Sequence, residues 1–369
     1  MKKVKLGEVC EILSGYAFKS SQFNDKKIGL PLIRIRDVER GFSDTYFEGA
    51  YPEEYLIKNG DLLITMDGNF ILKKWEGDLA LLNQRVCKVK ITDKSVDEDY
   101  ISWLIPKYLK EIEDKTPFVT VKHLSVAKIK DISFVLPNKP EQKLVSKELN
   151  TISQIYDFRK IQSEELNELV KSRFNEMFGD PVLNEMGWEK HALKEFGIWK
   201  SGGTPKRNEE EFFRGNIPWI TSGELEHKYI EDSFEKISEK AIECSSAKII
   251  EKGSLLLGMY DTAGLKSSIN TKVMSCNQAI AFAKLDDKIT NTIYVYYVIQ
   301  NLRSMLLNQQ RGVRQKNFNL SMIKNISLPL PPLSLQNEFA DFVAQVDKSQ
   351  FACQMSIKLW RNSLKSSII

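Results

Sequence analysis

The sequence repeats itself once, and this duplication constrains the fold more than any other feature. A Ser-Gly pair ending at Gly15 recurs at Gly202, with a lysine four residues after the glycine in both copies. Residues 29–33 (Gly-Leu-Pro-Leu-Ile) recur as residues 216–220 (Asn-Ile-Pro-Trp-Ile). Both matches lie 187 positions apart. The two halves of the chain therefore correspond in order and in spacing.

Three further matches follow in the same order at a larger offset. Residues 57–63 recur as 250–256 at an offset of 193, and residues 83–84 (Asn-Gln) and 129–137 recur as 277–278 and 323–331 at an offset of 194. The second copy has thus gained seven residues, in one surface region. Two copies are too few for a solenoid, which needs at least about three repeats. The duplication predicts two domains with similar folds.

Each copy is followed by a stretch that is typical of one long helix. Residues 141–178 contain no Pro and no Gly and are rich in Leu, Glu, Lys, Gln and Asn, and Gly-Asp-Pro at 179–181 ends the helix. At about 1.5 Å per residue, these 38 residues form a rod of about 57 Å, longer than the roughly 34 Å of one turn of B-DNA. A second such helix follows the second copy.

Both helices carry an apolar seam at alternating steps of four and three residues. A seam over four to five heptads predicts a coiled coil, in which Arg159, Ser163 and Gln350 would fix the register. The alternative is that each helix packs only on its own domain. The expected pairing positions are Val145, Leu149, Ile152, Tyr156, Leu166 and Val170 in the first helix, and Phe339, Val343, Val346, Cys353, Ile357, Trp360 and Leu364 in the second.

Within each copy the pattern predicts mixed α/β (α+β) structure. The expected strands cover residues 30–35, 61–66, 79–91, 254–259 and 279–285, and the expected helices cover 100–112 and 293–307. The predicted order is a globular domain at 1–138, a long helix at 139–180, a second globular domain at 181–332 and a second long helix at 333–369.

Charge and hydropathy exclude several classes of protein. Fifty-three Lys and Arg against 49 Asp and Glu give a net charge of +4, so any polyanionic partner must be met by local patches. No run approaches the roughly 18 apolar residues of a membrane helix, and residues 1–4 lack the apolar core of a signal peptide. We therefore expect a cytoplasmic protein with no membrane partner. The five cysteines, none in a C-x-x-C pair, favour reduced thiols.

The sequence offers no catalytic or metal-binding motif. The three histidines lie far from one another and from cysteines, which speaks against a zinc site or a Cys-His pair. Residues 258–267 fail the spacing of a phosphate-binding loop. Pro331-Pro332 lies between leucines, so a DNA methyltransferase motif is missing, and the acids near Asp180 are typical of a turn. We expect no catalytic residue, no metal and no cofactor in this chain.

Polar, basic and aromatic residues recur instead at loop positions in both domains, a pattern that suits DNA recognition. Lys and Arg neutralise phosphates, while Arg, Asn and Gln pair with base edges. The strongest segment is 309–317, with three cations and no acid. The candidates are Lys19, Arg34, Arg36, Asn69, Lys73, Lys74, Trp75 and Lys122 in the first domain, and Lys206, Arg207, Tyr260, Thr262, Lys266, Arg311, Arg314, Gln315 and Lys316 in the second.

The ordered blocks resemble the specificity subunit of type I restriction-modification enzymes over essentially the whole chain. The resemblance rests on residues 201–205 (Ser-Gly-Gly-Thr-Pro), 217–220, 253–256, 277–278 and 328–333 followed by Gln336, each with a counterpart in the first copy. The first copy departs from the pattern at Tyr16 to Phe18 and at Asn138 to Gln142.

The resemblance implies two target recognition domains joined by two conserved helices packed antiparallel, which gives a pseudo-twofold molecule. Each domain would read one half of a split, asymmetric DNA target. The helices would set the spacing and dock two methyltransferase (modification) subunits, and restriction/translocase subunits would complete the enzyme. S-adenosylmethionine would bind the methyltransferase partner, and ATP and Mg²⁺ the restriction partner. Two alternatives remain open: a coiled-coil scaffold that binds no DNA, and a diverged DNA-modifying enzyme.

Overall fold

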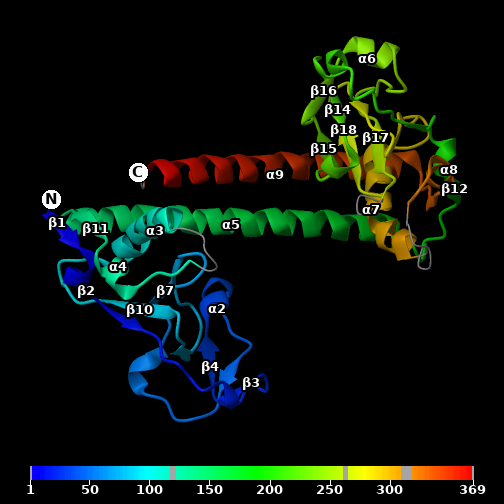
Figure 1. Ribbon diagram of the computed structural model, residues 1–369. Helices are drawn as coiled ribbons and strands as arrows, with labels where there is room; N and C mark the ends of the chain where they lie inside the picture. The colour runs from blue at the N-terminus through cyan, green and yellow to red at the C-terminus, as the bar shows by residue number, and fades with distance from the viewer. Residues whose placement is uncertain (1, 117–121, 261–264, 309–316, 368–369) are drawn as a thin grey trace. The chain divides into compact units, whose positions relative to one another are not determined.

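The computed structural model describes residues 2–116, 122–260, 265–308 and 317–367, with the side chains of 308 and 361–367 left aside (Figure 1). The chain divides into two compact units. The first unit comprises residues 1–160 and 355–369, and the second comprises residues 161–354. Each unit contains one copy of the sequence repeat together with a part of each long helix.

The first copy folds into three small sheets and a few helices. Its sheets have the orders β1-β11, β2-β10-β7-β8 and β3-β5-β4-β9-β6. The strands are β1 (Lys2–Lys5), β2 (Cys10–Ser14), β3 (Phe23–Asn24), β4 (Leu30–Ile33), β5 (Tyr46–Phe47), β6 (Leu56–Ile57), β7 (Leu62–Thr65), β8 (Leu72–Lys74), β9 (Ala80–Leu82), β10 (Val86–Ile91) and β11 (Ser133–Leu136), and the helices are α1 (Leu6–Val9), α2 (Ile35–Arg40), α3 (Glu98–Lys115) and α4 (Val126–Lys130).

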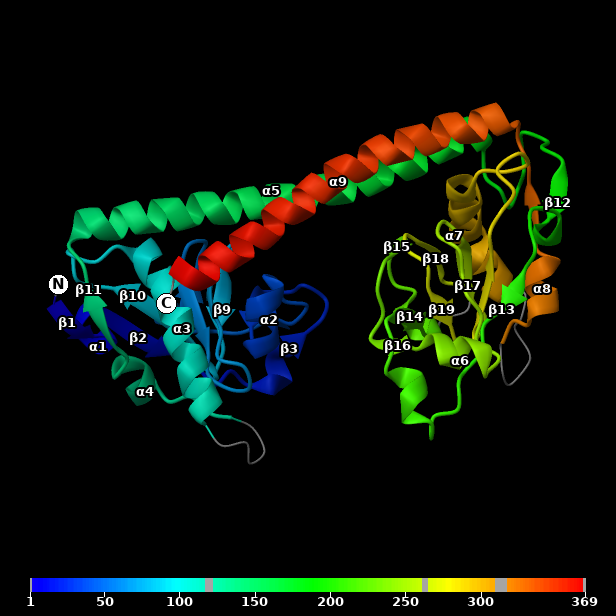
Figure 2. The ribbon, with the colours of Figure 1, turned by 90° about the horizontal axis from the view of Figure 1, so that it is seen from above.

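The second copy repeats this plan. Its sheets have the orders β12-β21, β13-β20-β17-β18-β15 and β16-β14-β19. The strands are β12 (Lys190–Ala192), β13 (Lys200–Ser201), β14 (Ile217–Ile220), β15 (Tyr229–Ile230), β16 (Glu235–Ile237), β17 (Leu255–Gly258), β18 (Ser267–Asn270), β19 (Ser275–Cys276), β20 (Ile280–Ala283) and β21 (Ser327–Pro329), and the helices are α6 (Glu239–Glu243), α7 (Thr292–Asn308) and α8 (Leu320–Lys324). Helix α7 packs beside β18 (Figure 2).

The strand registers confirm the duplication predicted from the sequence. In the first copy β4 pairs parallel with β9, with Ile33 opposite Leu82, and in the second β14 pairs parallel with β19, with Ile220 opposite Cys276. These partners differ by 187 and 194 positions, the same two offsets that the sequence repeat shows. The antiparallel pairs β7–β10 and β17–β20 keep the same correspondence. The two domains therefore share one fold.

A pair of glycines shows why the Ser-Gly block recurs. The backbone N–H of Gly15 donates to Val86 O, and that of Gly202 donates to Ile280 O at the equivalent position. A Cβ at Gly15 would lie 2.0 Å from the carbonyl oxygen of Asn83, and one at Gly202 would lie 2.2 Å from that of Cys276. Only glycine allows the chain to approach the neighbouring strand end this closely.

Two expectations about strands need correction. The strand predicted over 30–35 ends at Ile33, because the chain turns there into α2. The strand predicted over 79–91 is two strands, β9 and β10, separated by a turn at residues 83–85 in which Arg85 has φ of 72°. Both deviations expose polar residues at strand ends, and these residues form the candidate site described below.

The long helices predicted after each copy are present as α5 (Lys139–Phe178) and α9 (Leu333–Ser367). A fully buried glutamine fixes the start of each. The side chain of Gln142 accepts from the backbone N–H of Asp97 and donates to Ser95 O and Pro137 O. Gln336 accepts from the N–H of Asn291 and donates to Pro331 O. These bonds hold each long helix to the helix of its own domain, α3 or α7.

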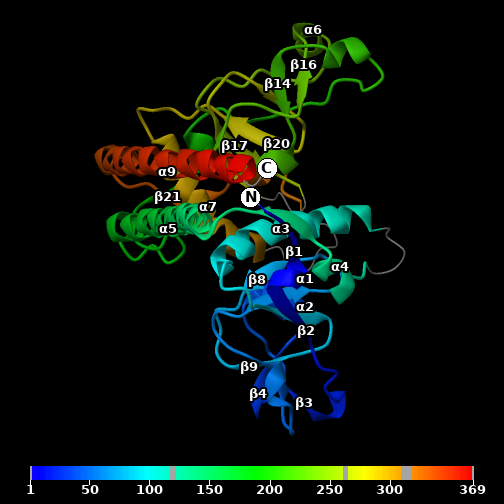
Figure 3. The same ribbon diagram turned by 90° about the vertical axis from the view of Figure 1, so that its left-hand side faces the viewer.

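Side-chain hydrogen bonds also attach α5 to α3 in the first unit. The ribbons of the two helices are labelled in Figure 3. The indole N–H of Trp103 donates to Asn150 Oδ1 at 2.8 Å, and the amide of Asn150 donates to Asp99 Oδ2 at 3.0 Å. Among the expected pairing positions in this unit, Leu149 is buried, and Ile152, Tyr156, Ile357 and Trp360 are half-buried. Val145 is 37% exposed, so its side chain is not buried at the predicted seam position. The side chain of Leu364 lies outside the described residues.

In the second unit the two helices run antiparallel. Arg173 pairs with Glu338 at 2.9 Å, the Gln350 amide donates to Asn167 Oδ1 at 2.7 Å, and Cys353 Sγ donates to Gln162 Oε1 at 3.3 Å. Seam residues also pack on the domain, as the alternative reading of the seam expected. Val170, Phe339, Val343 and Val346 share one buried core with α7, and Leu166 packs against it. Each seam thus serves both the partner helix and the domain.

Candidate DNA interface

In the first domain, the end of β4 and the turn between β9 and β10 form one shallow hollow. We call it the arginine hollow; its lining residues are Arg34, Ile35, Arg36, Asn83, Gln84 and Arg85. Parallel pairing of β4 with β9 puts the carboxyl ends of both strands at one sheet edge, so residues 49 positions apart in the sequence meet there. Such an edge is a common place for binding residues.

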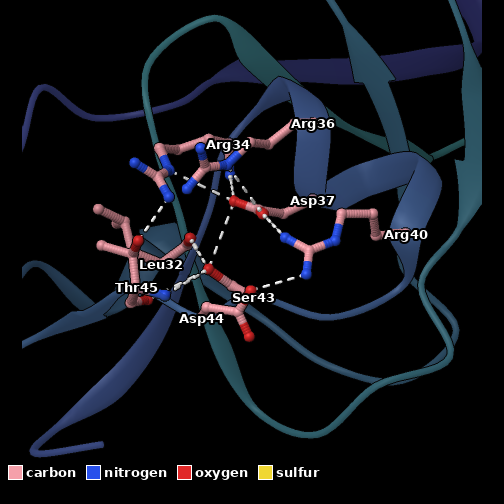
Figure 4. Close-up of polar contacts among 8 residues, drawn as sticks. All are labelled: Leu32, Arg34, Arg36, Asp37, Arg40, Ser43, Asp44 and Thr45. Atoms are coloured by element: carbon pink, nitrogen blue, oxygen red, sulfur yellow. Dashed lines mark hydrogen bonds and ion pairs between the residues drawn. The ribbon is translucent and has the colours of Figure 1, made fainter. Parts of the chain in front are cut away.

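A buried carboxylate lies behind two of these arginines (Figure 4). Asp37 is fully buried and caps α2, because it accepts from the backbone N–H of Arg34 at 3.1 Å. It pairs with Arg34 Nε at 3.4 Å, Arg36 Nε at 3.5 Å and Arg40 Nη1 at 3.6 Å. Ser43 Oγ donates to the same carboxylate at 3.3 Å. One buried negative charge therefore lies beside three guanidinium groups. Among them only Arg34 hydrogen-bonds it, and Asp37 Oδ1 has no hydrogen-bond partner within the described residues.

The remaining arginine of the hollow is held in the same way by another carboxylate. Arg85 Nε lies 3.4 Å from Asp67 Oδ2, and Asp67 Oδ1 lies 2.6 Å from Nδ1 of His123. The side chain of Arg85 is 54% exposed and that of Asp67 is 21% exposed. The arginine is thus accessible to a ligand while its carboxylate partner is mostly covered.

Two polar side chains complete the hollow. Asn83 is 7% exposed, and its Oδ1 has no hydrogen-bond partner within the described part of the chain. Gln84 is exposed, and its backbone N–H donates to Tyr16 O at 2.9 Å. A buried polar atom without a partner costs about 1–3 kcal/mol. Because Asn83 Oδ1 is itself buried, the amide that a ligand in the hollow can reach is that of Gln84.

The other first-domain candidates lie apart from the hollow, and several have partners within the protein. Lys73 donates to Glu39 O at 2.9 Å, Lys74 pairs with Asp99 at 3.1 Å, and Lys122 donates to Glu113 O at 2.8 Å. Lys19 and Asn69 are exposed. Trp75 is buried in the core, where its indole donates to Asp78 O, so it is no surface contact.

In the second domain, Arg207 contacts a carboxylate and two aromatic rings. Its two terminal nitrogens bond both oxygens of Glu235, at 2.5 and 2.9 Å, and its guanidinium lies 4.7 Å from the ring of Phe213 and 5.0 Å from that of Trp219. The bond to Arg207 holds the pKa of Glu235 below its ordinary value. Lys206 beside it is exposed. Thr204 donates a hydrogen bond to Gln278, the counterpart of Gln84.

The remaining second-domain candidates are described only in part. Tyr260 is 39% exposed, and Lys266 is half-buried beside Ser267 and Gln300 in a small surface depression. Thr262, Arg311, Arg314, Gln315 and Lys316 lie outside the described residues. The segment that the sequence favoured most strongly is among them.

Sequence reasoning missed Asp37, Asn83, Gln84 and Arg85. A signal for the turn was present, because Asn83-Gln84 is one of the blocks that recur in the second copy. The Asn-Gln pair at the end of the strand is the same in both copies, whereas the residue that follows it differs. This pattern is expected when two domains share a scaffold and differ in their surfaces. The partnership between Asp37 and the arginines gives no such signal, since acidic residues among arginines are common on helices.

A second polar cluster lies in a groove of the second unit, between β15, α7 and the two long helices. Lys228 pairs with Asp347 and donates to the hydroxyl of Tyr297 at 3.2 Å, and Tyr229 donates to Asp347 Oδ2 at 3.0 Å. Burial lowers the pKa of Lys228, against the effect of Asp347, and raises that of Tyr296 to about 12. Phe351, 64% exposed, lies on the same groove.

The described residues show neither a metal site nor a membrane-spanning helix. No group of three or more His, Cys, Asp or Glu side chains is arranged to hold a metal ion there. None of the described helices combines the length and apolar character that a membrane crossing requires.

Comparison with known families gives two matches along the chain. The model of the type I restriction modification DNA specificity domain matches residues 1–168 and residues 185–358. The specificity subunit of the type I restriction enzyme EcoBI from Escherichia coli is 28% identical over 383 aligned positions, covering 93% of this chain and 78% of that subunit. The EcoR124I/EcoR124II specificity subunit of the same organism is 27% identical, covering 59% of this chain and 56% of that subunit.

Solved structures share the fold at low sequence identity. The S subunit of a type I restriction-modification system from M. genitalium aligns with a TM-score of 0.69 and 12% identity, covering 100% of this chain and 94% of that one. A chain from a study of complex assembly and conformational transition in the type I R-M system aligns with a TM-score of 0.57 and 14% identity, covering 100% and 96%.

Proposed function

The chain belongs to the family of type I restriction-modification DNA specificity domains, of which it carries two, and from this premise we propose that each domain reads one half of a split, asymmetric DNA target. The observation that carries the proposal is the identical strand register of two domains whose surface residues differ. One scaffold with two different reading surfaces suits a target whose halves differ in sequence.

The long helices would separate the two readers and set the spacing of the half-targets. Forty residues of α5 correspond to about 60 Å at 1.5 Å per residue. The antiparallel contacts of the second unit, Arg173 to Glu338 and Asn167 to Gln350, support paired helices that resist bending. A stiff spacer of this kind fixes the distance between bound half-sites.

The same helices would dock the catalytic subunits. Exposed apolar side chains such as Phe158 and Phe351 lie on α5 and α9, where a partner could cover them. We infer that two methyltransferase subunits bind here and that restriction/translocase subunits complete the assembly. Catalysis would then belong to the partners: S-adenosylmethionine on the methyltransferase subunits, and ATP and Mg²⁺ on the restriction subunits. This chain would supply specificity and no catalytic residue.

The proposed DNA contacts follow from exposure and partners. In the first domain they are the residues of the arginine hollow, together with Lys19 and Asn69, which are exposed elsewhere on the domain, as phosphate or sugar contacts. In the second they are Lys206, Arg207, Tyr260 and Lys266, together with Thr262, Arg311, Arg314, Gln315 and Lys316. Lys73, Lys74 and Lys122 would have to leave their protein partners to bind DNA, so we expect smaller contributions from them.

Methylation mapping tests the proposal. The chain is expressed with its cognate methyltransferase subunits in a host that lacks other DNA methylation, and modified positions are sequenced. We expect one bipartite target with two different halves and a fixed gap. Methylation of a single short motif would contradict the two-reader model. Failure of the complex to bind any duplex, at low salt as well as at moderate salt, would favour a scaffold without DNA contacts.

A further inference from the structure

We propose that Arg36 and Arg85 are specificity-determining residues of the first domain, that they read a G·C base pair in its half-target, and that Asp37 and Asp67 are the positioning residues that hold them. The inference rests on the proposed function and extends it to the base chemistry of one half-target. It is carried by the arginine hollow and by its contrast with the equivalent surface of the second domain.

The second domain keeps the same anchoring hydrogen bonds at this place without the arginines, although its local backbone differs. Ala279 lacks the positive φ of Arg85, and Ser222–Glu224 form a 3-10 helix where the first domain has α2. The N–H of Asn83 donates to Ile33 O, and the N–H of Asn277 donates to Ile220 O at the equivalent position. Asp37 accepts from the N–H of Arg34, as Glu224 accepts from that of Thr221. With the offsets fixed in this way, the counterparts of Arg34, Arg36 and Arg85 are Thr221, Gly223 and Ala279.

The scaffold therefore does not need arginine at these positions. The capping carboxylate makes the equivalent bond to the N–H of Thr221, and the turn that ends at Ala279 keeps the bond from the N–H of Asn277 to Ile220 O. What the arginines add belongs to the surface of one domain only. A residue that differs between two copies of one fold, at the edge where ligands bind, is placed to determine what each copy recognises.

Arg36 and Arg85 differ from Arg34 in how many contacts they make with the protein and in how exposed they are. Arg34 is held by Asp37 and also donates to Thr45, and its side chain is 29% exposed. Arg36 Nε lies 3.5 Å from Asp37 Oδ1 in an ion pair without a hydrogen bond, and its side chain is 61% exposed. A guanidinium has five N–H donors, so a carboxylate on one edge leaves donors for a second acceptor pair. Arg36 and Arg85 are thus oriented and still able to bind, whereas Arg34 is structural.

Charge favours a base edge over a phosphate as the ligand. Asp37 and Asp67 cancel much of the positive charge of the hollow, which weakens a purely electrostatic attraction to phosphate. They leave the fork geometry of the guanidinium in place and reduce the entropy cost of ordering it. Oriented donors with little net charge suit recognition by hydrogen-bond pattern.

The hydrogen-bonding groups of the hollow match a G·C pair in the major groove. Guanine presents O6 and N7 as acceptors, for which arginine is the commonest specific partner, and cytosine presents its N4 amino group as a donor. The exposed side-chain amide of Gln84, which lines the hollow, carries an oxygen that can accept a hydrogen bond. The hollow thus combines donors for guanine with an acceptor for the paired cytosine.

Lysine substitutions separate this inference from a phosphate contact. The complex of the full chain with its methyltransferase subunits is titrated with the mapped target and with duplexes altered at each position of either half. Arg36→Lys and Arg85→Lys keep the charge and lose the fork. We expect each to weaken binding of the mapped target about 10-fold, to remove the preference for G·C at one position of the first half, and to leave the second half unchanged. Arg214→Lys, in the second domain and outside the hollow, is the matched control.

Three results would overturn the inference. One is a first half-target without any G·C pair. Another is full base preference in both lysine variants, which would assign the arginines to phosphate. The third is loss of preference in both halves together, which would indicate a general loss of structure. Absence of a bipartite target in the wild type would instead contradict the proposed function itself, so the two failures are distinguishable.

Discussion

The two domains share a skeleton and differ in what they present at one sheet edge. In both, a glycine without room for a Cβ, an Asn-Gln turn and a buried glutamine occupy equivalent positions. At the arginine hollow, the first domain has Arg36 and Arg85 where the second domain has Gly223 and Ala279. Residues that the fold requires are the same in the two copies, and residues at the reading surface differ. The comparison suggests which substitutions act on folding and which act on recognition.

The largest effect is expected from shortening both long helices. Removal of residues 158–164 with residues 351–357 takes one heptad from each helix and shortens the spacer by about 10 Å, or about three base pairs. Methylation mapping should show both half-targets unchanged and the gap reduced by about three base pairs. Ser163→Ala, within the same heptad, serves as the control. An unchanged gap would refute a spacer role for the helices.

The shared glycines should matter equally in the two domains. Gly15→Ala and Gly202→Ala each bring a Cβ to about 2 Å from a backbone oxygen, so the strand end must move. We expect each to lower the free energy of unfolding of its domain by about 3 kcal/mol, measured by urea denaturation of the full chain. Gly223→Ala, where a Cβ meets nothing within 4 Å, should change it by less than about 0.5 kcal/mol. A large loss of unfolding free energy for only one of the two glycine variants would contradict an equivalent role of the glycines in the two domains.

The buried glutamines offer a second matched pair with a somewhat smaller expected effect. Gln142→Leu leaves the N–H of Asp97 without a partner, and Gln336→Leu does the same to the N–H of Asn291. An unpaired buried backbone group costs about 1–3 kcal/mol, so we expect about 2 kcal/mol from each variant. Hydrogen exchange at these amides should rise in the variant of the same domain only. Unchanged protection would show that the glutamines do not hold the helices to the domains.

The smallest effect should come from a contact of the second domain that has no equivalent among the described residues of the first. Asp347→Asn weakens the bonds to Lys228 and Tyr229, which lie at the start of β15; the corresponding sheet of the described first domain ends at β8 without such a strand. We expect a loss of about 1–2 kcal/mol in the second unit, measured by the same denaturation. Asp341→Asn, on an exposed part of α9, provides the comparison. Equal stability of the two variants would mean that the Lys228 cluster adds nothing to the packing of domain on helix.

Features that depend on local pattern could be predicted from the sequence. Residues 141–178 lack Pro and Gly, so the long helix follows from composition, and the offsets of 187 and 194 positions predict which strands correspond. The arginine hollow could not be predicted, because it depends on parallel pairing that brings residue 34 beside residue 83. The burial of Trp75 could not be predicted from the sequence either. An aromatic residue next to lysines is typical of a surface, and only the packing shows that Trp75 belongs to the core.

The central claim is that each domain reads its own half of the target, and the matched turn residues test it most directly. Gln84→Ala and Gln278→Ala alter the same position of the shared scaffold, once in each domain. Methylation mapping of both variants should show relaxed base preference in one half-target for Gln84→Ala and in the other half for Gln278→Ala. Relaxation of the same half by both variants, or of both halves by either one, would contradict two independent readers.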